Sequence, residues 1–90
     1  MKKIRMNVNG RVQGVGFRIT TKMVADELGI RGVAKNEEDG SVTIEAVGED
    51  AAMATFLLKV KASPSPMGKV THFQAAEAPE LPDFKNFSTR

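Results

Sequence analysis

The stretch Val8–Arg18, VNGRVQGVGFR, decides the fold, because the end of a strand pattern, a glycine loop and the start of a helical pattern follow one another within it. Gly14 and Gly16 flank Val15, so the backbone can adopt positive φ angles there and turn successive N–H groups into one concavity, which binds anions. Arg18 adds a planar fork that matches phosphate or carboxylate oxygens, beside the positive end of the following helix. The stretch therefore predicts a strand, an anion-binding loop and a helix in direct succession.

The rest of the chain alternates between strand and helix periodicity. Period-two patterns and turn residues predict strands at about residues 3–12, 31–37, 41–48 and 68–77, and a short extended ending around residues 84–89. Gly10, inside the first of these strands, predicts a bulge or a close backbone approach. The sequence Glu38-Asp39-Gly40 supplies the turn of a β-hairpin between the second and third strands.

Two helices are predicted between these strands. The first spans about residues 18–28 and ends at Gly29, since apolar residues recur near helical spacing within it: Ile19, Met23, Val24 and Leu28. In the second, apolar residues fall at positions i, i+3, i+4 and i+7: Met53, Phe56, Leu57 and Val60. Acidic residues precede the second helix, lysines close it, and the sequence Ser63-Pro64-Ser65-Pro66 ends it.

The resulting order is βαββαβ with a small final strand. It predicts one α+β domain over residues 1–90, an antiparallel sheet of four to five strands with two helices on one face. The chain has no cysteine, which excludes disulfides, a thiolate nucleophile and cysteine-ligated metals. It has one histidine, so we expect no all-protein metal site and no cofactor.

The charge of the chain is unevenly spread. Residues 1–35 hold eight Lys or Arg and two acidic residues, whereas residues 36–58 hold six acidic residues and no basic one. This distribution favours a small anionic ligand near the first third of the chain over nucleic acid. The start, MKKIRMN, has no apolar run of a signal peptide, and no segment is apolar enough to cross a bilayer. We therefore expect a cytoplasmic protein.

Better-known glycine motifs do not fit. Ile19 stands where the dinucleotide fingerprint requires a third glycine, and no Gly-Lys-Ser/Thr of a P-loop follows. The sequence Gly29-Ile30-Arg31-Gly32 matches the GXXG loop of KH domains, but a strand hairpin follows it instead of a helix. Glycine spacing alone also leaves open an ordinary tight turn with a solvated Arg18.

Two motifs together resemble those of the acylphosphatase family. VNGRVQGVGFR is similar to the phosphate-binding signature of that family, and GVAKNEEDGSVTIEAVG is similar to its second signature. A helical pattern lies between them, and the closing FSTR resembles the last strand of the family. The resemblance covers nearly the whole chain, and it implies the ferredoxin-like form of the βαββαβ fold.

The resemblance implies an enzyme. The expected reaction is the metal-independent hydrolysis of small acyl phosphates to a carboxylate and inorganic phosphate, which would also bind as product or inhibitor. Arg18 matches the phosphate-binding arginine of the family, and Asn36 matches the asparagine that orients the attacking water. The phosphate-binding loop corresponds to these residues: Gln13, Gly14, Val15, Gly16 and Phe17.

Another class of function remains open, a non-catalytic module that binds phosphate or carbamoyl phosphate within a larger protein. RNA binding is a weaker alternative, because the strand Ser41–Gly48 has no aromatic residue on which bases could stack. No second apolar face is evident, which favours a monomer.

Several residues also have plainer interpretations. Without the resemblance, Asn36 reads as a turn residue and His72 as a surface residue. Val33 and Thr89 depart from the family pattern, which has an aromatic residue at the first position and an apolar residue at the second. We expect both departures to affect packing more than chemistry.

Overall fold

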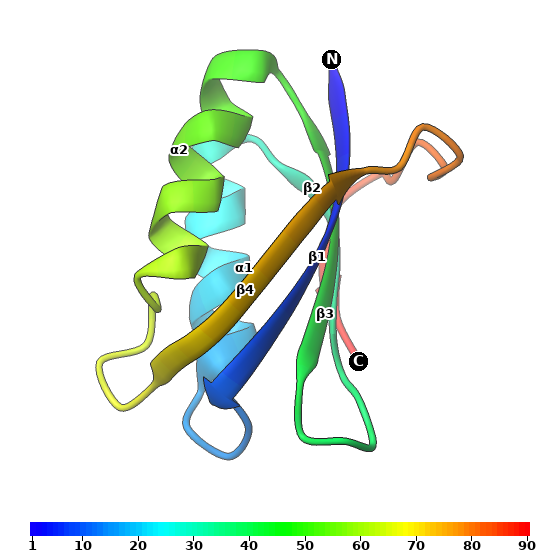
Figure 1. Cartoon of the computed structure of the whole chain (residues 1–90). Helices are drawn as coiled ribbons and strands as arrows, with labels where there is room; N and C mark the ends of the chain where they lie inside the picture. Colours follow the sequence, from blue (N-terminus) through cyan, green and yellow to red (C-terminus); the bar gives the residue numbers. More distant parts are fainter.

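The computed structural model describes the whole chain, Met1–Arg90, and its elements follow the predicted order (Figure 1). The elements are β1 (Lys2–Arg11), α1 (Phe17–Leu28), β2 (Arg31–Asn36), β3 (Val42–Gly48), α2 (Asp50–Lys61), β4 (Lys69–Glu77) and β5 (Phe87–Thr89). The predicted boundaries of β1 to β4 and of α1 lie within one residue of these.

The five strands form one sheet in the order β4-β1-β3-β2-β5. The first four strands pair antiparallel, as predicted, whereas β5 pairs parallel with β2 over Gly32–Ala34. The loop between β4 and β5 reverses the chain, so β5 runs in the direction of β1 and β2. The sheet is therefore mixed, and its one parallel pair lies at an edge.

Both helices cover the same face of the sheet (Figure 1). The core lies between these two layers, because alternate residues of β1 point toward the helices and are buried: Ile4, Met6 and Val8. The pattern changes at Gly10, where the register with β4 shifts. Gly10 has a φ of 125°, and a Cβ there would lie 2.1 Å from the carbonyl oxygen of Lys69. This confirms the predicted bulge and explains why the position is a glycine.

The buried face of α2 is the predicted one, with Met53, Phe56 and Val60 fully buried. The buried face of α1 differs from the predicted spacing. Its inward residues are Phe17, Thr21 and Ala25, whereas the side chains of Ile19 and Met23 are 54% and 58% exposed.

The phase of α1 follows from its first residue. Phe17 enters the core with only 1% of its surface exposed. Ile19 lies two residues after Phe17, and Met23 lies two residues after Thr21. Each is therefore about 200° around the helix from its inward neighbour. Val24 and Leu28, in contrast, pack against the core. An apolar pattern alone therefore assigned Ile19 and Met23 to the wrong face.

Three connections gather at one end of the sheet (Figure 1). They are the loop between β1 and α1, the β2–β3 turn and the loop between α2 and β4. The turn is the predicted one, since the N–H of Gly40 donates to the oxygen of Glu37 and the N–H of Glu37 donates to the oxygen of Ser41. This end of the molecule carries the predicted anion-binding residues.

Candidate active site

The predicted anion-binding loop adopts the expected backbone conformation. Gly14 and Gly16 both have a φ of 75°, a region that favours glycine, and Gly16 precedes the first residue of α1. No side chain caps this helix, and its first turn contains no acidic residue. The first amide of the helix to reach a main-chain acceptor is that of Thr20, which donates to Gly16 at 3.1 Å. The preceding amides are available to an anion, as the sequence predicts.

Side chains fix where the helix begins. The hydroxyl of Thr20 donates to the oxygen of Gly16 at 2.8 Å and to that of Phe17 at 3.1 Å. The buried ring of Phe17 anchors the first turn in the core. These contacts hold the N-terminus of α1 at a fixed position and direction relative to the loop.

Arg18 and Asn36 meet at one main-chain oxygen. The Nη1 of Arg18 donates to the oxygen of Arg90 at 2.5 Å, and the N–H of Asn36 donates to the same oxygen at 3.1 Å. The N–H of Arg90 in turn donates to the oxygen of Ala34 in β2 at 2.8 Å. The fold therefore brings together two residues that lie far apart in the sequence and were assigned to one site.

Gln13 has a role for its side chain that the sequence did not indicate. Its Nε2 donates to the main-chain oxygens of Glu37 and Ser41, both at 2.9 Å. The side chain therefore ties the anion-binding loop to the β2–β3 turn. The predicted contribution of Gln13 to phosphate binding comes from its main-chain N–H, which these two side-chain bonds do not use.

A hollow of about 170 Å³ lies at the candidate site. It lies over the start of α1 and is lined by Val12, Gly14, Gly16, Phe17, Arg18, Ile19 and Thr89. Gln13, Val15 and Asn36 do not line it, although Asn36 is exposed nearby at the end of β2. Thr89 is exposed and lines this hollow, so it lies outside the core in which its departure from the family pattern was expected to affect packing. For Val33, which is 2% exposed on β2, the same expectation agrees with its buried position.

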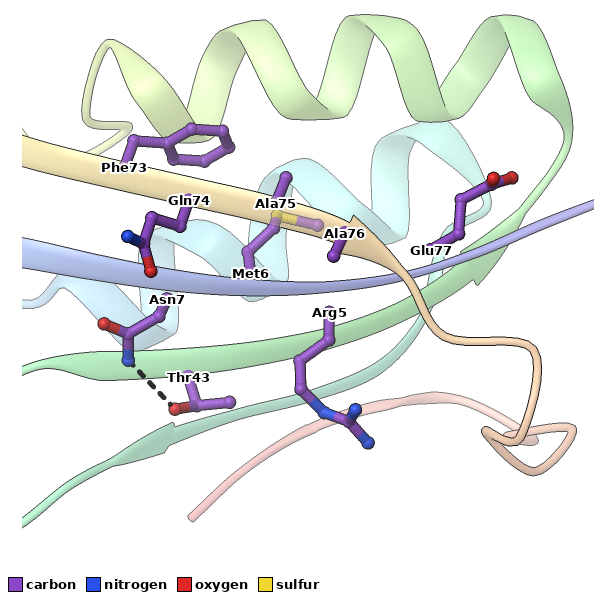
Figure 2. Close-up of a pocket in the computed structure, with 9 residues that line it drawn as sticks. All are labelled: Arg5, Met6, Asn7, Thr43, Phe73, Gln74, Ala75, Ala76 and Glu77. Atoms are coloured by element: carbon purple, nitrogen blue, oxygen red, sulfur yellow. Dashed lines mark hydrogen bonds between the residues drawn. The ribbon is translucent and has the colours of Figure 1, made fainter.

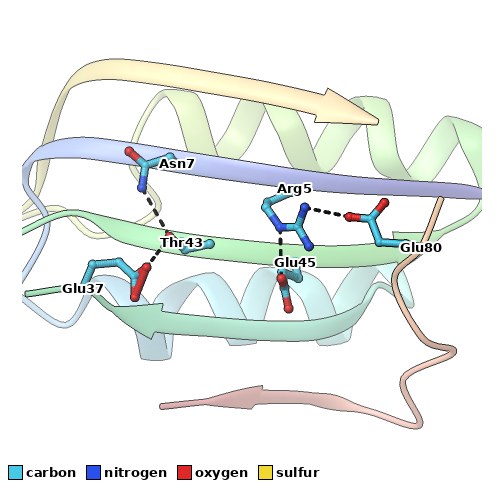
Figure 3. A network of polar contacts seen from close by, with 6 residues as sticks. All are labelled: Arg5, Asn7, Glu37, Thr43, Glu45 and Glu80. Atoms are coloured by element: carbon cyan, nitrogen blue, oxygen red, sulfur yellow. Dashed lines mark hydrogen bonds and ion pairs between the residues drawn. The ribbon is translucent and has the colours of Figure 1, made fainter. Parts of the chain in front are cut away.

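A larger hollow, of about 680 Å³, lies elsewhere, over β1, β3 and β4 (Figure 2). Its one arginine, Arg5, is already paired, with Nε 3.0 Å from Glu45 and Nη1 2.8 Å from Glu80 (Figure 3). Hydrogen bonds to these two carboxylates raise the pKa of Arg5 above its ordinary value. The main-chain N–H of Glu80, and then Arg5, lower the pKa of Glu80. One guanidinium faces two carboxylates here, so the cluster carries a net negative charge and the smaller hollow is the better candidate for an anion.

The remainder of this polar sheet face is also internally bonded. The Nδ2 of Asn7 donates to the hydroxyl of Thr43, which donates to the carboxylate of Glu37 at 3.1 Å (Figure 3). His72 is exposed on β4. No group of three or more His, Cys, Asp or Glu side chains is placed to hold a metal ion, and no helix is long and apolar enough to span a bilayer.

Comparison with known proteins identifies the chain. A model of the acylphosphatase family matches residues 4–89. The chain belongs to the acylphosphatase family. An acylphosphatase of Enterococcus faecalis is 55% identical over 87 residues, which cover 97% of this chain and 96% of the relative. The family assignment made from the two signature motifs is therefore confirmed, and the curated relatives are named as enzymes.

Solved structures confirm the fold. The crystal structure of acylphosphatase from Bacillus subtilis is similar with a TM-score of 0.94 at 41% identity, and the match covers 100% of this chain and 99% of that one. The ferredoxin-like α+β assignment is thus correct. Full-length HypF, solved in a phosphate- and nucleotide-bound form, is similar with a TM-score of 0.89 at 27% identity. That match covers 99% of this chain and 12% of HypF.

Proposed function

We propose that this acylphosphatase-family domain hydrolyses the carboxyl–phosphate bond of small acyl phosphates at the start of α1, without a metal ion. The amides of residues 13–17 and the guanidinium of Arg18 bind the phosphoryl group, and Asn36 orients the attacking water. The observation that carries this assignment is the shared bond of Arg18 and Asn36 to the oxygen of Arg90, which holds both residues beside the anion-binding loop.

The chemistry suits a site without an acid or a base. The water oxygen forms a bond to phosphorus while the bond from phosphorus to the acyl oxygen breaks, and the carboxylate leaves with the bonding electrons. A carboxylate is a weak base, so it leaves without protonation. The amide of Asn36 accepts no proton near neutral pH and acts by holding the water in line. The proton of the water passes to a phosphate oxygen, which becomes part of the inorganic phosphate.

Electrostatic stabilisation is then the main contribution of the protein. Negative charge spreads over the equatorial oxygens of the phosphoryl group in a loose transition state, and fixed N–H donors stabilise it. Arg18 offers five N–H donors in a rigid fork. The bond from Nη1 to Arg90 uses one end of this fork and orients the remainder.

The second candidate is a binding module without catalysis. The similarity to a part of HypF favours it, because the same fold there forms 12% of a larger chain. The coverage of nearly the full length of the Enterococcus and Bacillus acylphosphatases favours the enzyme. We further propose that residues 1–90 act as one domain, as a cytoplasmic monomer that binds no nucleic acid; gel filtration with light scattering tests the oligomeric state.

The deciding experiment is the hydrolysis of benzoyl phosphate, followed by ultraviolet absorbance in the presence of a chelator. Wild type is expected to turn over, and Asn36→Ala is expected to lose most of kcat while it binds inorganic phosphate as wild type does. Circular dichroism checks that the variant is folded. A folded wild type that binds phosphate but does not hydrolyse the substrate would support the binding module instead.

A further inference from the structure

The loop between α2 and β4 contacts the anion-binding loop through one buried hydroxyl. The Oγ of Ser65 donates to the main-chain oxygen of Val15 at 2.6 Å, across 50 residues of sequence. Ser65 is 3% exposed, so this bond is shielded from water. The two loops lie at the same end of the molecule (Figure 1). The sequence predicted only that this segment ends α2.

The bond fixes one particular peptide group. In a trans peptide the C=O of one residue and the N–H of the next point in opposite directions within one plane. The bond from Ser65 holds the oxygen of Val15, so it also sets the direction of the N–H of Gly16, away from Ser65. Gly16 lines the hollow over α1, and its amide belongs to the proposed phosphate-binding set.

We infer that Ser65 is a positioning residue for phosphate binding, because its hydroxyl holds the Val15–Gly16 peptide in the orientation that directs the Gly16 amide to the phosphoryl group. This inference rests on the proposed function. A loop with glycines on both sides of Val15 has many accessible conformations. Most of them do not direct the amides toward one point, so ordering the loop around the anion costs entropy and weakens binding. Fixing the peptide in advance removes that cost when the anion binds.

Ser65 is itself held in place. Its main-chain oxygen accepts bonds from the hydroxyl of Ser63 at 2.9 Å and from the N–H of Gly68 at 3.1 Å. The flanking prolines, Pro64 and Pro66, restrict the φ angle on both sides. The Ser65 hydroxyl therefore presents a fixed donor to the anion-binding loop.

The test compares two serines of the same loop. Ser65→Ala removes the bond to Val15, and Ser65→Cys replaces the hydroxyl with a weak donor of similar shape. The matched control is Ser63→Ala, which loses a hydroxyl whose bond stays within its own loop. Calorimetry with inorganic phosphate gives Kd, benzoyl phosphate hydrolysis gives kcat and KM, and thermal unfolding gives Tm for each variant.

Both Ser65 variants are expected to raise the phosphate Kd and the KM about 3- to 10-fold, the effect of losing one hydrogen bond. Ser63→Ala keeps the Ser65 hydroxyl, and the N–H of Gly68 still holds the main-chain oxygen of Ser65. It is therefore expected to lower Tm comparably and to raise Kd much less than the Ser65 variants do. Folded Ser65 variants with the wild-type Kd would overturn the inference, even where wild type is a good enzyme. If wild type binds phosphate and hydrolyses nothing, the proposed function fails, whereas weaker binding by the Ser65 variants still supports the positioning role.

Discussion

The two helices have the same length, 12 residues, but opposite charges at their N-termini. α2 has Asp50 in its first turn and lysines at positions 59 and 61 in its last turn, so its own side chains complement its dipole. α1 has no acidic residue in its first turn and no basic residue in its last turn, and its N-cap is Gly16. Neither helix has a side-chain hydrogen bond at its N-cap.

The difference shows that the charges of α2 complement its own dipole, whereas α1 has no carboxylate at its positive end. The positive end of α2 is occupied by a carboxylate of the chain, which also lies 3.6 Å from the amino group of Met1. The positive end of α1 is left to an anion from outside, with Arg18 beside it. The missing stabilisation of α1 is compensated by the burial of Phe17 and the bonds of Thr20.

The largest effect on catalysis is expected from Arg18, the positive charge in the first turn of α1. Arg18→Ala should reduce kcat/KM for benzoyl phosphate by about 10²–10³, the usual loss for one preorganised donor to a developing oxyanion. Lys22→Ala, one turn later, is the control, because Lys22 forms a surface ion pair with Asp26 at 2.8 Å. We expect it to stay within about twofold of wild type. Full activity in a folded Arg18→Ala protein would remove Arg18 from the mechanism.

The next prediction compares two glycines, Gly14 and Gly29, to separate the effect of backbone strain on stability from an effect on phosphate binding. Gly14 and Gly29 have φ angles of 75° and 71°, and a Cβ at either would meet nothing within 4 Å. Alanine at either position should therefore lower the free energy of unfolding by a similar amount, about 1–2 kcal/mol, because a residue with a Cβ is strained in the left-handed region. Only Gly14→Ala should also weaken phosphate binding, measured by calorimetry. Equal phosphate affinity in the two variants would argue that the loop at Gly14 does not hold the anion.

A smaller effect is expected when the first-turn charges of the two helices are changed, by adding a carboxylate to α1 or removing one from α2. Ile19→Glu gives α1 an acidic first turn at an exposed position and should raise the free energy of unfolding by about 0.3–1 kcal/mol. It should also raise the phosphate Kd about fivefold by charge repulsion. Asp50→Asn in α2 should lower stability by a similar amount and leave Kd unchanged. Unaltered phosphate binding by Ile19→Glu would show that the anion does not lie at this helix end.

The smallest effect is a pH dependence at the turn to which Gln13 is tied. The hydroxyl of Ser41, and then its N–H, lower the pKa of Asp39 below its ordinary value of 3.8. A lowered pKa adds stability above pH 3.8 that is lost as the pH falls further and the carboxyl is protonated. Asp39→Asn should therefore be less stable than wild type at pH 7, and the difference in unfolding free energy should shrink as the pH falls below 3.8 in chemical unfolding. A difference that is constant with pH would contradict this assignment.

The fold and family were predictable because their signals are local. The glycines at positions 14 and 16, the bulge at Gly10 and the stripe of α2 each follow from a few neighbouring residues. The exposure of Ile19 was not predictable from spacing, since the phase of α1 depends on where Phe17 enters the core. Small inward residues such as Thr21 and Ala25 carry no strong apolar signal.

The contacts that complete the candidate site had no sequence signal. The hydroxyl of Ser65 reaches Val15 across 50 residues, and the oxygen of Arg90 joins Arg18 to Asn36. Each contact uses a main-chain oxygen, a group that every residue has. Residue identity therefore says nothing about which oxygen is the partner, and only the packed fold does.

The bond of Arg18 to the oxygen of Arg90 has a consequence for folding kinetics. Arg90 follows β5, whose parallel pairing with β2 joins segments 55 residues apart, and such long loops close late in folding. The guanidinium has its acceptor only after this edge has docked. Activity during refolding should therefore return only after this edge has docked, and later than the circular dichroism signal of the helices.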